Sequence, residues 1–193
     1  NSYSDELVKE AAKRGLSNYK ATPEALKAFI SDKTIAMFEE LDVMSRTELE
    51  ARYEIKMEKY IKKIQIEARV MGDVAINHIL PTAIKYQNRL VENTKGLKDV
   101  LDSKTYIKLS RNQINTIKQI SEHISAVKEL VDAMVAARKV ANKIEDTTKQ
   151  GFAYRENVVK YFDPIRKHVD DLELLIDNEL WPLPKYRELL FLK

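Results

Sequence analysis

Histidine side chains are the first candidates for chemistry in this chain, because they can ligate metals and move protons near neutral pH. The three histidines are His78, His123 and His168. None has a glutamate three residues before it, so the Glu-x-x-His pair of di-iron helix bundles is absent, and so is His-Glu-x-x-His. We therefore expect surface or partly buried histidines and no metal site.

Carboxylates gather at two places where a catalytic acid–base pair is conceivable. Both groups lie among lysines and arginines at helical spacing, which is typical of solvated helix faces with i, i+4 ion pairs. The glycines at 15, 72, 96 and 151 are too scattered for a phosphate-binding loop. The sequence therefore predicts no catalytic, cofactor-binding or metal-binding residue. The two carboxylate groups are Glu48, Glu50 and Glu54, and Asp170, Asp171 and Glu173.

Basic residues give no sign of a nucleic-acid site. Lys56, Lys59 and Lys63 share one helical face, but Glu58 and Glu67 lie close to them. The chain carries 33 Lys and Arg against 30 Asp and Glu, and its net charge of +3 is too small to predict nucleic-acid binding. We expect no nucleic-acid partner.

The elements that position these side chains are expected to be helices. Only 4 Gly and 5 Pro occur, and 33% of the residues are charged, a balance typical of long helices rather than of strand-rich folds. The chain of 193 residues is long enough to bury a sizeable core. We expect an all-α fold.

One long helix is expected from Ser45 to Leu101. Its apolar residues follow an eleven-residue period, which keeps one face aligned along a nearly straight helix. Ser45 and Glu48 are spaced as a capping box at its start, and we expect a kink rather than an end at Pro81. The apolar residues that define the period are Leu49, Tyr53, Met57, Tyr60, Ile64, Ala68, Met71, Ala75 and Ile79.

Two further apolar stripes predict two more long helices. The second helix is expected at about 105–150, with Gly151 as the break after it. The third passes through Pro164 with its phase intact, which favours one kinked helix; Asp163 is the N-cap if there are two. The two stripes are Ile117, Ile120, Ile124, Val127, Val131, Met134, and Val158, Phe162, Ile165, Val169, Leu172, Ile176, Leu180.

Short helices complete the prediction. One is expected at 4–14, with Ser4 as its N-cap and Gly15 as its stop. Thr22 and Ser31 are expected to cap two more, and the C-terminal prolines open a last one through Leu189 and Phe191. Together the elements predict an antiparallel bundle of three long helices plus short N-terminal helices, with 1–44 joining an upstream domain and 45–193 forming the bundle.

The chain gives no sign of secretion or of membrane insertion. It has no cysteine, and its longest apolar run, Ala133 to Ala137, is far shorter than the ~20 residues that cross a bilayer. It starts at Asn without a charged-then-apolar leader. We expect a cytoplasmic protein without a membrane partner, and a fragment whose true start lies upstream.

Several long motifs, in order along the whole chain, resemble the C-terminal region of type III glutamine synthetases. The central motif runs from Met71-Gly72-Asp73 through Asn77-His78-Ile79-Leu80-Pro81-Thr82-Ala83-Ile84-Lys85-Tyr86-Gln87-Asn88. The others are Lys9-Glu10-Ala11-Ala12-Lys13-Arg14-Gly15-Leu16-Ser17-Asn18, Thr22-Pro23-Glu24-Ala25-Leu26, Glu50-Ala51-Arg52-Tyr53-Glu54-Ile55 and Trp181-Pro182-Leu183-Pro184-Lys185-Tyr186-Arg187-Glu188-Leu189-Leu190-Phe191.

The resemblance implies a parent enzyme that ligates ammonia to glutamate with ATP and magnesium, and that works as a ring-shaped homo-oligomer. The family's metal-binding glutamates and nucleotide contacts lie upstream of this region. The resemblance therefore assigns no catalytic, ATP-binding or magnesium-binding residue here, and we expect no enzyme activity from the chain alone. It implies a structural role, in which the chain packs on its own catalytic domain and on neighbouring subunits. The alternative is a free-standing helical scaffold or adaptor bundle that binds partner helices.

Overall fold

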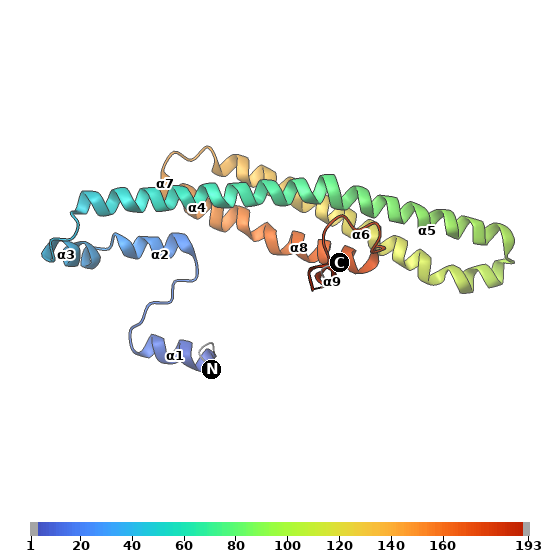
Figure 1. Cartoon of the computed structure of the whole chain (residues 1–193), viewed down its shortest axis with the longest axis horizontal. Coiled ribbons are helices and arrows are strands. Elements are labelled where there is room, and N and C mark those ends of the chain that lie inside the picture. The colour runs from blue at the N-terminus through green and yellow to red at the C-terminus, as the bar shows by residue number, and fades with distance from the viewer. Residues whose placement is uncertain (1–3, 191–193) are drawn as a thin grey trace. The chain divides into compact units, whose positions relative to one another are not determined.

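The computed structural model describes residues 4–190, and every regular element in that range is helical (Figure 1). The predicted all-α class is therefore confirmed. The α-helices are α1 (Asp5–Lys13), α2 (Thr22–Phe29), α3 (Asp32–Glu40), α4 (Arg46–Val74), α5 (Leu80–Val100), α6 (Ser103–Ala141), α7 (Thr147–Ala153), α8 (Phe162–Leu175) and α9 (Tyr186–Leu190). Two π-helical turns, η1 (Ala75–Ile79) and η2 (Tyr154–Val158), and the 3-10 turn η3 (Val159–Tyr161) lie between them.

The chain divides into two compact units. The first unit contains Asn1–Ile64 and Ala141–Glu156, and the second contains Gln65–Val140 and Asn157–Lys193. The predicted boundary at residue 44 and the arrangement of three long helices in one bundle stay predictions. None of the described helices combines the length and the apolar composition that a bilayer-spanning segment needs.

The first unit packs α7 against the start of the long helix. The hydroxyl groups of Tyr53 and Thr148 are hydrogen-bonded at 2.8 Å, and Met57, which is fully buried, lies against Gly151. The rings of Phe29 and Phe38 pack in a tilted arrangement, 6.3 Å between centroids, which joins α2 to α3. These contacts therefore join α7 to α4 and α2 to α3 within the first unit.

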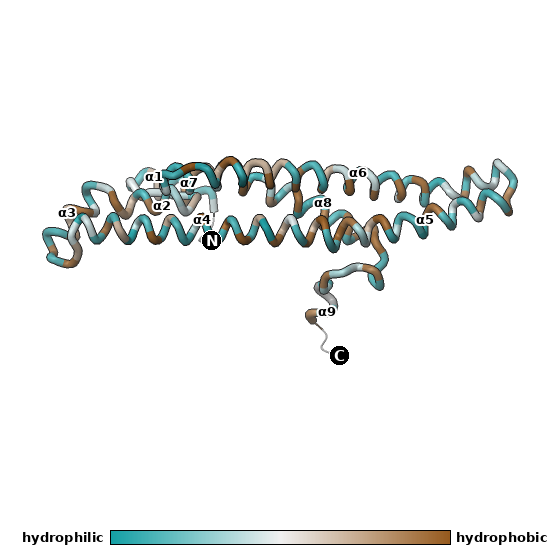
Figure 2. Tube along the Cα trace, turned by 90° about the horizontal axis from the view of Figure 1, so that it is seen from above, coloured by the Kyte–Doolittle hydropathy of each residue, from teal (hydrophilic) through white to brown (hydrophobic). Residues whose placement is uncertain are grey.

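The second unit contains an antiparallel pair of helices, α5 and α6. The side-chain amide of Asn93 donates to the side-chain oxygen of Gln113 at 2.9 Å. The side-chain amide of Gln87 donates to the backbone carbonyl of Ile117 at 2.9 Å. Residue numbers fall in α5 as they rise in α6, so the two helices run in opposite directions (Figure 1). Figure 2 shows apolar and polar residues interspersed along both helices.

The core of the second unit lies where α8 joins this pair. Its buried members come from η1, α5, α6, α8 and the segment after α8. The predicted stripes contain four of these residues but not Ala83 or Trp181, so helical periodicity identified most of the core-facing side. The buried members are Ile79, Ala83, Ile120, Leu172, Ile176 and Trp181.

The predicted helix starts are confirmed at most positions. Ser4 and Ser31 cap α1 and α3, and Gly15 follows α1 with a φ of 74°. The Ser45 amide donates to the Glu48 carboxylate at 2.8 Å, and the Glu48 amide donates to the Ser45 hydroxyl at 3.4 Å, which completes the capping box. The prediction for Thr22 was wrong, because α2 begins one residue earlier and Ala21 is its N-cap.

Pro81 lies inside a continuous helical stretch from 46 to 100, as predicted. The helix meets the proline through η1, where the amide of Leu80 donates to the carbonyl of Ala75, five residues back. Proline lacks an amide hydrogen and its ring crowds the carbonyl four residues before it, so a wider turn at this point relieves both problems.

Two predictions about the end of the second long helix were wrong. The second long helix ends at Ala141 rather than near 150, and Gly151 lies inside α7 instead of breaking a helix. The break falls at 142–146, where Asp146 accepts a hydrogen bond from the amide of Lys149 at 2.7 Å and caps α7. Residues 147–175 are then helical throughout, but pass through η2 and η3 before Pro164, and Asp163 is not an N-cap.

Candidate functional site: an apolar groove and a histidine pair

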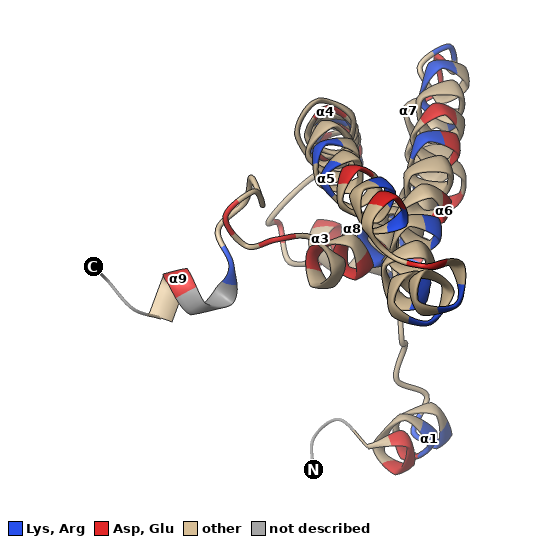
Figure 3. Cartoon of the chain, turned by 90° about the vertical axis from the view of Figure 1, so that its right-hand side faces the viewer, with Lys and Arg blue, Asp and Glu red and all other residues tan. Residues whose placement is uncertain are grey.

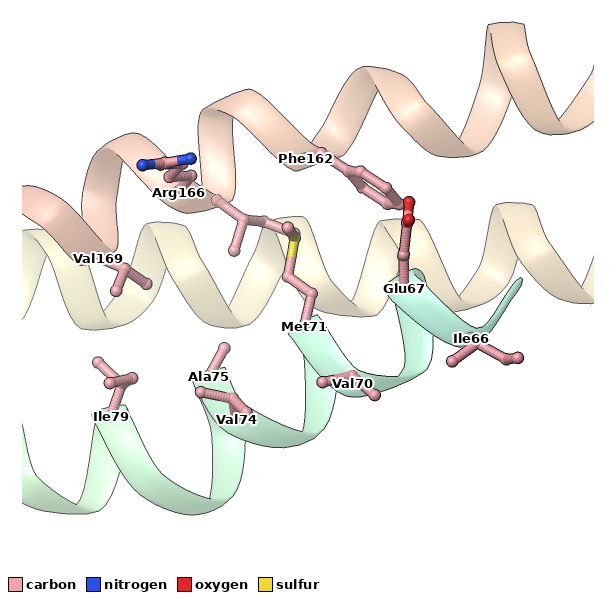
Figure 4. Close-up of a pocket in the computed structure, with 11 residues that line it drawn as sticks. Ile66, Glu67, Val70, Met71, Val74, Ala75, Ile79, Phe162, Arg166 and Val169 are labelled. Carbon is pink, nitrogen blue, oxygen red and sulfur yellow. The ribbon is translucent and has the colours of Figure 1, made fainter. Parts of the chain in front are cut away.

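An apolar groove of about 500 Å³ lies in the second unit, between the end of α4 with η1 and the first turns of α8. Figure 4 shows Met71 extending from α4 toward α8, with Phe162 and Val169 on the opposite wall. Nearly all of its lining is aliphatic or aromatic. The lining residues are Ile66, Glu67, Val70, Met71, Val74, Ala75, Ile79, Phe162, Ile165, Arg166 and Val169.

The rim of the groove carries a row of apolar side chains, of which two are exposed and the third, Val74, is half-buried. Ile66, Val70 and Val74 are spaced by four residues along α4, so they lie on one face. Ile66 is 61% exposed and Val70 is 55% exposed. A continuous apolar face next to a groove is typical of a surface that packs against another protein segment. This site therefore suits apolar side chains better than a charged substrate, which requires several convergent polar groups.

Charged groups are confined to the edge of the groove. The guanidinium of Arg166 lies 3.5 Å from the carboxylate of Asp170, one turn along α8, and both side chains are mostly exposed. Such a pair contributes little to the stability of the fold. Along the helices of the second unit, acidic and basic residues alternate without forming a field of one sign (Figure 3).

The first predicted carboxylate group has a structural role at the start of α4. Glu48 belongs to the capping box, and hydrogen bonds from the amide and then the hydroxyl of Ser45 lower the pKa of its carboxyl group. Glu50 lies 3.8 Å from Arg46 in an exposed i, i+4 pair. A similar cap occurs at α6, where the Thr105 side chain and then its amide lower the pKa of Asp102.

The structure brings together two of the three histidines. Nδ1 of His123 in α6 lies 2.9 Å from Nδ1 of His168 in α8, and Asp171 lies beside them. His78 is exposed on η1. Sequence motifs within one helix do not reveal this pair, because its members come from two helices. One signal in the sequence points to the pair. His123 and His168 directly precede Ile124 and Val169, which belong to two apolar stripes that pack together.

The chain belongs to the glutamine synthetase C-terminal domain family: the sequence model of that family matches residues 1–98 of this all-α protein. The chain is 48% identical to a glutamine synthetase from Bacteroides fragilis (strain YCH46) over 99% of its own length. It is 30% identical to a type-3 glutamine synthetase from Dictyostelium discoideum and 29% identical to a glutamine synthetase from Butyrivibrio fibrisolvens, again over 99% of the chain.

The resemblance to type III glutamine synthetases predicted from the motifs is confirmed by these matches. The chain spans about a quarter of the length of these relatives: 26%, 26% and 27% respectively. The matched part is their C-terminal region.

Proposed function

We propose that this chain is the C-terminal helical domain of a glutamine synthetase, with a structural, non-catalytic role in assembly of the enzyme. In this proposal the whole protein is a cytoplasmic homo-oligomer that ligates ammonia to glutamate. ATP and magnesium bind to its catalytic part rather than to residues of this chain. The match to glutamine synthetases over 99% of the chain favours this function over a free-standing scaffold.

The observation that carries the structural role is the exposed apolar groove. Ile66 and Val70 expose more than half of their side chains to water, although Ile79 and Ile165 beside them are buried. Covering apolar surface contributes about 25 cal/mol per Å² to association, so such a face favours a partner. About three quarters of each relative's length lies outside the matched region. In this proposal, that part of the same polypeptide is the partner.

The proposed occupant of the groove is the catalytic region of the same enzyme, either from its own subunit or from a neighbouring one. The row of Ile66, Val70 and Val74 offers contacts at helical spacing, which suits the apolar side chains of a helix or a loop. Because the charged groups stay at the edge, the centre of such an interface would be dry and apolar.

The test uses the full-length enzyme with the double variant Ile66→Ser and Val70→Ser. We expect a smaller oligomer at equal concentration by native mass spectrometry, and a loss of glutamine formation that follows the loss of the oligomer. The matched control is Ile107→Ser with Leu109→Ser, two exposed apolar residues of α6 that do not line the groove. The control is expected to keep the mass and activity of the wild type.

Two outcomes would contradict the proposal. An enzyme truncated after Ser45 that kept full assembly and activity would exclude a structural role for the region. ATP turnover by the purified chain, above the background of a blank preparation, would exclude a non-catalytic role. Circular dichroism of the chain separates an assembly defect from unfolding, because the groove variant is expected to retain the wild-type helical signal.

A further inference from the structure

We infer that His123, His168 and Asp171 form a binding site for a divalent transition-metal ion, for which Zn²⁺ is the best match. The three residues belong to the second unit, with His123 on α6 and the other two on α8. Within the part of the chain that the structure describes, the ligand atoms of these three residues lie close enough together to hold one ion.

The distances between the ligand atoms suit one shared ion. The two Nδ1 atoms are 2.9 Å apart, and a carboxylate oxygen of Asp171 lies within 4.8 Å of a ring nitrogen of each histidine. Nitrogens bound to Zn²⁺ at about 2.0–2.1 Å are about 3.3 Å apart in a tetrahedral site. A separation of the rings by about 0.4 Å therefore opens the space that the ion needs.

The kind of donor narrows the class of ion. Neutral imidazole nitrogens favour zinc, copper, iron and nickel, whereas magnesium and calcium favour oxygen ligands. Two imidazoles with one carboxylate therefore select a transition metal. Three protein ligands leave a position for water or for another side chain. In the ion's absence the same two nitrogens can share a proton in a hydrogen bond, which is the competing explanation for their closeness.

The helices hold the three ligands in place. His168 and Asp171 are separated by three residues, so both lie on the same face of α8. Ile120 and Leu172, next to the ligands on α6 and α8, are fully buried in the core of the unit. All three ligands are half-buried, so an ion can reach them while the surrounding backbone stays fixed.

A bound ion would join α6 to α8 and stabilise the folded chain, because an ion that binds only the folded state raises the unfolding temperature as its concentration rises. The experiment titrates the purified chain, first freed of metal with a chelator, with Zn²⁺ alone in a calorimeter. Thermal unfolding is followed in parallel by circular dichroism. We expect one Zn²⁺ per chain and an unfolding temperature that increases with Zn²⁺ concentration.

Single variants of the three ligands identify the site. Loss of an outer-shell partner weakens metal affinity by about 10- to 100-fold. We expect each of three ligand variants to weaken Zn²⁺ binding by at least as much: His123→Ala, His168→Ala and Asp171→Asn. The matched control is His78→Ala, which removes an exposed histidine of the same chain and should bind as the wild type does.

Failure of this inference is separable from failure of the proposed function, since no readout depends on enzyme activity or assembly. The inference is overturned if the wild type takes up no stoichiometric Zn²⁺, or if His78→Ala loses as much affinity as His123→Ala. If a variant unfolds, the wild type still tests the inference. Co²⁺ bound by the histidines produces visible d–d absorption. A wild-type chain that shows no such absorption with Co²⁺ overturns the inference.

Discussion

Gly151 of α7 faces Met57 of α4 so closely that a Cβ at residue 151 would lie 3.1 Å from Cγ of Met57, and closer still to its sulfur. Met57 is fully buried, so its side chain has little room to move aside. The glycine is therefore required for packing within the first unit, although it has helical backbone geometry that other residues also adopt.

Gly151→Ala is expected to destabilise the chain. Overpacking of a core costs about 1–3 kcal/mol, whereas alanine recovers only about 0.5–1 kcal/mol of helix propensity. The net loss, about 1 kcal/mol at the middle of these two ranges, is measured by urea unfolding. The matched control is Gly96→Ala in α5, where a Cβ meets nothing within 4 Å. This control should gain about 0.5–1 kcal/mol, and equal effects at both positions would contradict the prediction.

Ile120→Ala is expected to lower the free energy of unfolding by about 2–5 kcal/mol, because it leaves a cavity among fully buried side chains. Ile120 is fully buried in the core of the second unit. Ile107→Ala, on the same helix but 68% exposed, is expected to stay within about 0.5 kcal/mol of the wild type. Chemical denaturation of both variants measures the difference, and similar losses would show that the two positions are not packed as described.

Glu48→Gln is expected to reduce stability at neutral pH and to have less effect in acid. Hydrogen bonds from Ser45 hold the pKa of the Glu48 carboxyl group below its ordinary value of 4.5. A lowered pKa in the folded state adds stability above the unfolded pKa, and this gain is lost as the pH falls through the folded value. Urea midpoints of both proteins should therefore converge below pH 4.5. A gap that stays constant with pH would contradict the prediction.

The sequence predicted most of the buried face of each helix. Leu49, Met57 and Ile79 were placed in the core by their spacing alone, and all three are fully buried. Periodicity works here because each helix must turn its apolar side toward another element, whichever element that is. The capping box at Ser45 was predictable for a related reason, since it depends only on residues three apart.

Tertiary contacts explain what the sequence did not predict. Gly151 suggested a helix break, but the proximity of Met57 is what requires a small residue there. The actual break comes before Thr147, where Asp146 caps α7 with its side chain. Asp146 is an ordinary N-cap residue, but the prediction placed the break at Gly151 instead. The pairing of His123 with His168 depends on how far α8 is shifted along α6, and spacing within one helix contains no information about that shift.

The wide turn η1 also has a consequence for changes in chain length. A π-helical turn contains one residue more than the α-helical turn it replaces. Losing one residue between Ala75 and Ile79 would therefore restore an ordinary turn and leave Ala83 still pointing inward, whereas a deletion elsewhere in the helix would rotate everything beyond it by about 100°. The cost of such a deletion falls on Pro81, because the proline ring again crowds the carbonyl four residues before it in an ordinary turn.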